Sequence, residues 1–214
     1  MEILEEISTL VQRGRAPKVK ELIAQAVEQG ISANTILEEG LLSAMSIVGD
    51  KFRNNEIFVP EVLVSARALN AGLEILRPHL MKAGVEAKGV AVIGTVKGDL
   101  HDIGKNLVKM MLEGNGLQVI DLGVDVPAET FIEKAIEYKA QLICCSALLT
   151  TTMTEMKAVV EKAQQAGIRN QVKILIGGAP ITQEFCENIG ADYYTPDGAS
   201  AGKLALELCQ QMKG

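Results

Sequence analysis

Residues 90–104 have the sequence VAVIGTVKGDLHDIG, and this stretch decides the fold. Its first part, Val90–Thr95, is a short apolar run rich in β-branched residues, which predicts a strand buried on both faces. Its second part contains glycines, aspartates and one histidine, and a helical pattern then extends over 103–114. A buried strand followed by a polar loop and a helix is the first half of a strand–helix–strand unit.

The same alternation continues toward the end of the sequence. Short apolar runs recur at 118–122, 141–147 and 172–176, with a weaker one at 192–195. Helical patterns lie between and after these runs, at 128–139, 153–166, 181–189 and 199–212. The alternation predicts a flavodoxin-like, doubly wound, five-stranded parallel sheet, because each crossover helix covers one face of strands that are apolar on both sides.

The segment before this region has helical periodicity throughout. Apolar residues recur three or four positions apart in four stretches of residues 1–82, which predicts a four-helix bundle. Gly14 and Gly30 suit helix ends, Ser32 or Asn34 can cap the third helix, and Pro60 suits the first turn of the fourth. We therefore expect a helical domain over 1–83, a linker over 84–88 and a sheet domain over 89–214.

Composition excludes several classes of partner. The formal net charge is −6, so the chain lacks the surplus of Lys and Arg that binds nucleic acid or anionic membranes. The N-terminus has no signal-peptide pattern, and no apolar run approaches the ~20 residues of a membrane span. The four cysteines have no CxxC or Cys/His spacing and are typical of reduced core thiols. We expect a cytoplasmic protein.

Unusual residues follow three of the predicted strands. Asp99 and His101 come after the first strand, a run of hydroxyls at 146–152 after the third, and Gly177 and Gly178 after the fourth. In an open parallel sheet these carboxyl ends form the ligand-binding edge. Glycine permits close backbone approach to a ligand, and hydroxyls supply hydrogen bonds without filling the cavity.

His101 is the candidate metal ligand. A carboxylate that accepts the second N–H of an imidazole fixes its tautomer, and Asp99 is well placed for this. His79 is the only other histidine and the cysteines form no cluster, which argues against a zinc site made of protein ligands alone. A metal with one protein ligand brings its other ligands with it, which favours a macrocycle. Two plainer readings stay open: a lone loop histidine is usually a solvated surface residue, and Asp99 or Asp102 can cap the following helix.

Three motifs resemble those of B12-binding domains. Asp99–Gly104 matches the family's DxHxxG motif, Ser146–Leu148 its SxL motif, and Gly177–Gly178 its GG motif, in order and spacing. Residues 48–52 (VGDKF) and 58–61 (FVPE) resemble the cap module that precedes this domain in cobalamin-dependent methionine synthase. The chain as a whole is similar to the small corrinoid proteins of three-component methyltransferase systems.

The resemblance implies a role for each matched residue. His101 is the lower axial ligand of cobalt in cobalamin or a related corrinoid, Asp99 bonds its other nitrogen, and Thr152 completes the relay where the family has serine. Protonation of this relay loosens His101 when cobalt becomes Co(I). The remaining cofactor-binding positions implied are Gly98, Asp102, Ile103, Gly104, Ser146, Leu148, Thr150, Gly177 and Gly178, with Phe58 of the helical domain as a capping side chain.

The function implied is that of a methyl carrier rather than a complete enzyme. Co(I) accepts a methyl group from methylamine, methanol, a quaternary amine or a methoxyaromatic through a substrate-specific methyltransferase, giving methylcobalamin. A second methyltransferase then passes the methyl to tetrahydrofolate or a thiol. A reductive activator is a further implied partner, and nucleic acid and membranes are not.

Other functions fit parts of the pattern. The small subunit of an adenosylcobalamin-dependent mutase shares the three motifs but normally lacks a helical cap. A B12-dependent sensor has a helical module but adds a DNA-binding helix-turn-helix. A flavodoxin-like protein without B12 is the remaining alternative.

Overall fold

The computed structural model describes residues 2–212, which divide into two compact units. One unit ends at Ala87 and also includes Gly114–Gly116, and the other comprises Lys88–Glu113 and the chain from Leu117 onward. No helix within residues 2–212 is long and apolar enough to cross a membrane.

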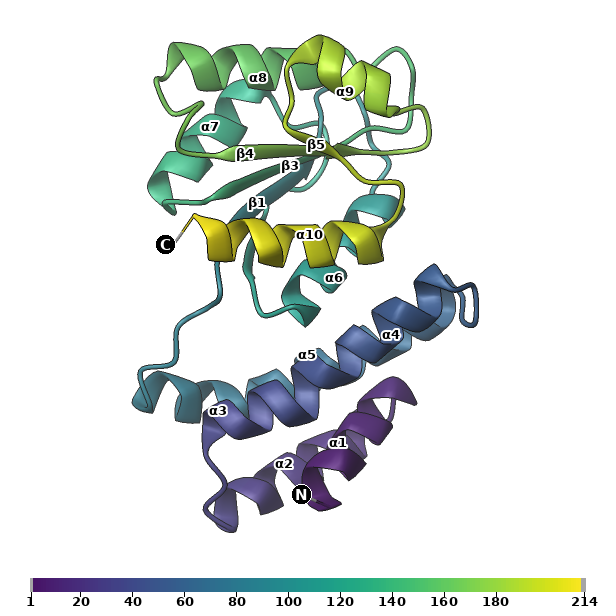
Figure 1. Cartoon of the computed structure of the whole chain (residues 1–214), viewed down its shortest axis with the longest axis vertical. Coiled ribbons are helices and arrows are strands. Elements are labelled where there is room, and N and C mark those ends of the chain that lie inside the picture. Colours follow the sequence, from purple (N-terminus) through teal and green to yellow (C-terminus); the bar gives the residue numbers. More distant parts are fainter. Residues whose placement is uncertain (1, 213–214) are drawn as a thin grey trace. The chain divides into compact units, whose positions relative to one another are not determined.

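The helical unit contains the helices that the sequence predicts. They are α1 (Glu2–Gln12), α2 (Ala16–Glu28), a third helix built from α3 (Ala33–Thr35), η1 (Ile36–Leu42) and α4 (Ser43–Arg53), and α5 (Val59–Lys82) (Figure 1). Of the two possible caps, Ser32 is used, and its hydroxyl accepts a hydrogen bond from Thr35 N at 3.1 Å. The π-helical segment η1 was not predicted.

A close approach of two helices organises the core of this unit. A Cβ at Gly72 of α5 would lie 2.7 Å from Ile23 Cδ1 of α2 and 3.0 Å from Val19 Cγ1. A side chain at this position would therefore require Ile23 and its neighbours to shift, because the core is closely packed.

Within residues 2–212 the second unit contains a parallel sheet of five strands, as predicted. The strands are β1 (Val90–Thr95), β2 (Gln118–Asp121), β3 (Leu142–Ser146), β4 (Lys173–Gly177) and β5 (Tyr193–Tyr194), in the order β2-β1-β3-β4-β5. This is the flavodoxin-like order. Thr95 pairs with Ser146, and Ser146 pairs with Gly177, so three strands end in register at one edge. The loops that carry the motifs therefore begin side by side.

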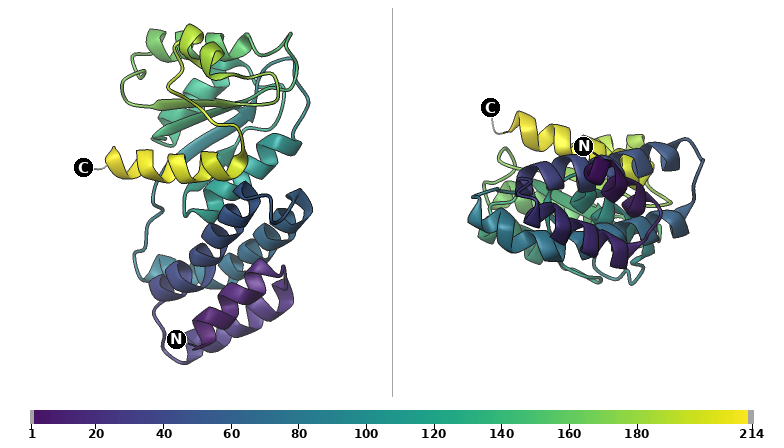
Figure 2. Two further views of the ribbon diagram at one scale, coloured as in Figure 1. Left: turned by 45° about the vertical axis from the view of Figure 1, so that its right-hand side comes forward. Right: turned by 90° about the horizontal axis from the view of Figure 1, so that it is seen from below.

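Helices cover both faces of the sheet (Figures 1 and 2). One core cluster includes residues of α7 (Ala128–Glu137), α8 (Glu155–Gln165) and α9 (Gln183–Ile189), and the other includes residues of α6 (Ile103–Gly114) and α10 (Gly198–Gln211). Cys145 belongs to the first cluster and Cys144 to the second, so these neighbours point to opposite faces. Burial raises the pKa of Cys144 to about 12, which agrees with a packing role.

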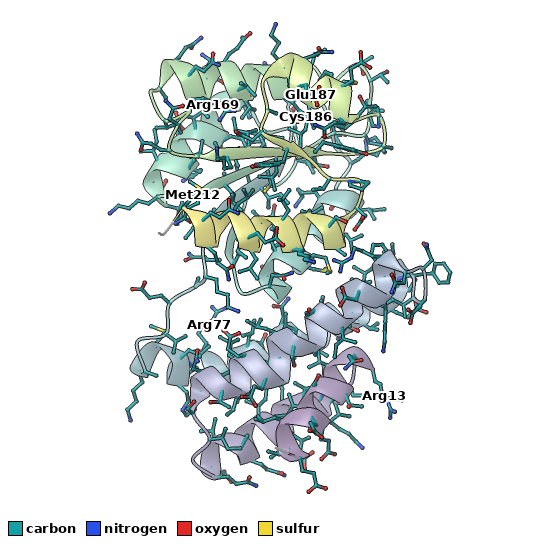
Figure 3. The ribbon with its side chains drawn as sticks, viewed as in Figure 1. Arg13, Arg77, Arg169, Cys186, Glu187 and Met212 are labelled. Carbon is teal, nitrogen blue, oxygen red and sulfur yellow. The ribbon has the colours of Figure 1, made fainter. Side chains whose placement is uncertain are left out.

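The short edge strand β5 is held by a polar contact outside the ladder. Arg169, labelled in Figure 3, follows α8, and its guanidinium pairs with Asp192 at 2.9 Å. Asp192 also accepts a hydrogen bond from Ile174 N of β4 at 2.7 Å. The carboxylate thereby fixes the start of β5 beside β4.

Candidate functional site

Asp99 is the centre of the site, and its side chain is completely buried. Oδ1 accepts hydrogen bonds from His101 N at 3.1 Å and lies 2.8 Å from His101 Nδ1. Oδ2 accepts from Leu148 N at 2.8 Å, Leu149 N at 3.2 Å and Thr152 Oγ1 at 2.8 Å. One carboxylate thus joins the loop after β1 to the loop after β3.

These contacts determine the charge of Asp99. Burial on its own raises the pKa of a carboxyl group. Here the backbone N–H groups of His101 and Leu148 and the side chains of His101 and Thr152 outweigh burial, so the pKa of Asp99 falls well below its ordinary value of 3.8. Asp99 is therefore ionised at neutral pH and acts as an acceptor.

His101 is fixed at one nitrogen and open at the other. Because ionised Asp99 accepts, Nδ1 is the donor, and in the neutral imidazole Nε2 has the free lone pair. About half of the His101 side chain (51%) is exposed. The backbone of His101 is held as well, because the buried Thr95 hydroxyl donates to its carbonyl oxygen at 2.8 Å.

Thr152 lies on the opposite side of Asp99 from His101. Its hydroxyl is 2.8 Å from Asp99 Oδ2 and 3.1 Å from Leu149 O. The single hydroxyl proton favours the carboxylate, since hydrogen bonds to charged acceptors are shorter and stronger. The structure therefore contains a continuous Thr152–Asp99–His101 chain of hydrogen bonds.

The surroundings of His101 are apolar and open. Leu100 (71% exposed) and Ile103 (76%) flank it, and Leu148 and Leu149 are also exposed on the neighbouring loop. An added Cβ at Gly104 would meet no atom within 4 Å. Exposed apolar side chains beside a single imidazole fit a large, partly apolar ligand.

The set of donors also fits a metal that brings its own ligands. In the described residues no cluster of three or more His, Cys, Asp or Glu side chains could hold a metal ion. A corrinoid needs only one axial ligand from the protein, and His101 presents one nitrogen for it. The residues present therefore fit this cofactor.

The other predicted residues lie as follows. Ser146 is half-buried at the end of β3, and Thr150 is exposed in the loop after it. Gly178 (φ +138°) is required by the fold, because a Cβ there would lie 1.8 Å from Ala147 O, whereas one at Gly177 would have ordinary contacts. Asp102 accepts a hydrogen bond from the Asn106 amide. Phe58 belongs to the helical unit and is 65% exposed before α5.

Sequence reasoning missed several residues in and around the loop after β1. Thr95 contacts His101 as described, and Asp125 contacts the backbone of Gly98 and Asp99. Lys105 is buried on α6 and pairs with Asp121 at 2.6 Å. A hydroxyl at the end of the first strand was a usable signal for Thr95. The contact of Asp125 depends on β2 lying beside β1, which no local pattern encodes.

Two family models match the chain, both described as a B12 binding domain, over residues 89–202 and 3–77. A trimethylamine corrinoid protein of Methanosarcina mazei is 46% identical over 90% of this chain and 87% of its own length. A dimethylamine corrinoid protein of Methanosarcina acetivorans is 42% identical over 97% and 96%. The methanol:cobalamin methyltransferase complex of Methanosarcina barkeri contains a chain with a TM-score of 0.87 and 31% identity, covering 97% of this chain and 80% of that one.

Proposed function

The chain belongs to the B12-binding family of corrinoid proteins of methyltransferase systems, and from this premise we propose that it carries methyl groups from a methylated amine. It binds a corrinoid and works with a methyltransferase partner. Support for an amine as the donor comes from identity: relatives named for trimethylamine and dimethylamine are 46% and 42% identical, and the methanol-system chain is 31% identical.

The single observation that carries the role of methyl carrier, as distinct from the choice of an amine donor, is the buried Asp99 carboxylate between His101 and Thr152. In this proposal His101 is the protein ligand of cobalt. Asp99 keeps the proton on Nδ1, so that the lone pair of Nε2 is available, and a carboxylate in this position also raises the basicity of the ligand. Thr152 holds the second oxygen of Asp99 and so fixes the direction of the carboxylate.

When bound, the corrinoid supplies a cobalt centre that accepts a methyl group and releases it to an acceptor. The residues of the chain would bind the cofactor and orient the imidazole of His101, about half of which is exposed.

The other matched residues would line the cofactor pocket. Gly98 and Asp102 belong to the His101 loop, and Ile103, Gly104 and Leu148 would contact the corrin. Ser146, Thr150, Gly177 and Gly178 would accept the nucleotide tail. Residues 1–83 would form the cap, with Phe58 as a capping side chain, joined by a linker at 84–88 to the domain of residues 89–214.

The proposed partners are three proteins in the cytoplasm. An amine-specific methyltransferase loads the chain, and an acceptor-side methyltransferase passes the methyl group to tetrahydrofolate or a thiol. A reductive activator restores the low-valent cofactor after accidental oxidation.

Methyl transfer from labelled substrates tests the donor. The full chain is reconstituted with a corrinoid, reduced, and mixed with a trimethylamine-, dimethylamine- or methanol-specific methyltransferase and its methyl-labelled substrate. We expect label on the chain with an amine-specific enzyme and none when that enzyme is omitted. Labelling by the methanol-specific enzyme alone would contradict the amine assignment.

A further inference from the structure

Asp125, in the loop between β2 and α7, holds the backbone on both sides of Asp99. Its Oδ1 accepts a hydrogen bond from Gly98 N at 2.7 Å. Its own backbone N donates to Asp99 O at 2.9 Å. One residue from a neighbouring loop therefore holds the Lys97–Gly98 and the Asp99–Leu100 peptide groups, one on each side of the Gly98–Asp99 peptide.

The backbone conformation of Asp125 favours glycine, which indicates that the aspartate side chain has a role of its own. Its φ is +53°, in the left-handed region where glycine is the least strained residue. Aspartate and asparagine tolerate this region better than other side chains. Glycine would relieve the strain but would lose the acceptor for Gly98 N. Aspartate provides both the conformation and the acceptor.

The loop that Asp125 holds lies beside Thr152. A Cβ placed on Gly98 (φ +79°) would make an ordinary van der Waals contact with Thr152 Cγ2, at 3.4 Å. Thr95 fixes the next part of the loop through His101 O. Asp125 therefore acts on a segment whose displacement would move Asp99 relative to both of its side-chain partners.

We propose that Asp125 is a positioning residue for the axial ligand. It sets the place of the Gly98–Asp99 backbone, and through it the direction in which the Asp99 carboxylate meets His101. The inference rests on the proposed role of His101 as the cobalt ligand. The plainer alternative is a turn residue that stabilises its own loop and leaves the ligand unaffected.

The test uses the full chain, labelled with ¹⁵N-histidine, reconstituted with hydroxocobalamin and reduced to Co(II). Electron paramagnetic resonance then measures the fraction of cobalt coupled to a histidine nitrogen, and absorbance titration measures hydroxocobalamin affinity. Asp125→Gly removes the acceptor without adding backbone strain. Asp125→Asn keeps an acceptor oxygen and tolerates the left-handed conformation. Lys139→Gly is the matched control, because Lys139 is also left-handed (φ +50°) but lies between α7 and β3.

We expect Asp125→Gly to lose part of the histidine coupling and to bind hydroxocobalamin about fivefold more weakly, the effect of one lost hydrogen bond. Asp125→Asn should keep most of the histidine coupling and most of the hydroxocobalamin affinity. Lys139→Gly should match the wild type in both measurements. Wild-type coupling and affinity in Asp125→Gly would overturn the inference and leave the ligand role of His101 intact. Absence of histidine coupling in the wild type would overturn both the inference about Asp125 and the ligand role of His101.

A second measurement does not depend on the folding of a variant. In the wild-type chain without cofactor, the Gly98 amide should exchange its hydrogen more slowly than the amide of an unstructured peptide, because Asp125 accepts it. Exchange at the unprotected rate would overturn the inference.

Discussion

At the scale of single residues, the ionised Asp99 carboxylate links the imidazole of His101 to the hydroxyl of Thr152 through hydrogen bonds of 2.8 Å each. Substituting Asp99 by Ala leaves the imidazole and the amides of Leu148 and Leu149 without this acceptor, and leaves the Thr152 hydroxyl with Leu149 O alone. We expect corrinoid affinity to fall about 10–100-fold, the usual cost of losing the partner of a metal-bound histidine. Absorbance titration measures the change.

Thr152→Ser is the control for this prediction, because serine keeps the hydroxyl that donates to Asp99. Its affinity should stay close to that of the wild type. If Asp99→Ala bound the corrinoid as tightly as the wild type, Asp99 would have no role in holding the ligand.

A substitution at Gly104 should affect the stability of the fold and the binding of the cofactor in opposite directions. It lies in the first turn of α6, where an added methyl group meets no atom within 4 Å. Gly104→Ala should therefore raise the free energy of unfolding of the cofactor-free protein, by up to about 1 kcal/mol from helix propensity. It should also weaken corrinoid binding if the corrin lies against α6. Calorimetry and titration measure the two effects, and unchanged affinity would remove Gly104 from the pocket.

At the scale of elements, an ion pair fixes α6 to the end of β2. Lys105 is 3% exposed and pairs with Asp121 at 2.6 Å, and Lys109 contacts the same carboxylate at 3.2 Å. Burial raises the pKa of Asp121, but hydrogen bonds from Lys105, the Gly123 N–H and Lys109 outweigh it, so this pKa lies below its ordinary 3.8. The pair therefore stabilises the fold above that value, and its contribution is lost as the pH falls through the lowered pKa.

Asp121→Asn tests this pH dependence. At neutral pH the wild type should exceed the variant in the free energy of unfolding by about 2 kcal/mol, the range for a hydrogen bond to a charged group. The difference should shrink below pH ~4, because protonated Asp121 resembles asparagine. Urea unfolding across this range measures it, and a difference independent of pH would refute the account of the pair.

Much of the element pattern could be predicted because it follows from local periodicity. The apolar run at 90–95 matches β1 residue for residue, and α6 begins and ends where the helical pattern does. The π-helical turn η1 was missed, since its residues have the same spacing as an α-helix. The contacts of Leu149 and Asp125 with the motif loop were also missed, because they arise only when separate strands align at one edge.

At the scale of the whole molecule, ligand binding is coupled to folding. A corrinoid that binds only the folded chain should raise the midpoint of thermal unfolding. The stabilisation should grow with the logarithm of the corrinoid concentration and reach about 2.7 kcal/mol at a hundred times Kd. Removal of the corrinoid should restore the lower midpoint. Scanning calorimetry measures the shift, and an unchanged midpoint at saturating corrinoid would contradict specific binding to the native state.

The most direct test of the central claim is the electron paramagnetic resonance spectrum of the Co(II) form, made with ¹⁵N-histidine, for the wild type and His101→Ala. His79 is the only other histidine in the chain, so the assignment is unambiguous. We predict a doublet splitting from one ¹⁵N nucleus in the wild type and its loss in His101→Ala. A ¹⁵N splitting that persists in His101→Ala, or a ¹⁴N triplet from the cofactor's own base in the wild type, would contradict the claim that His101 binds cobalt.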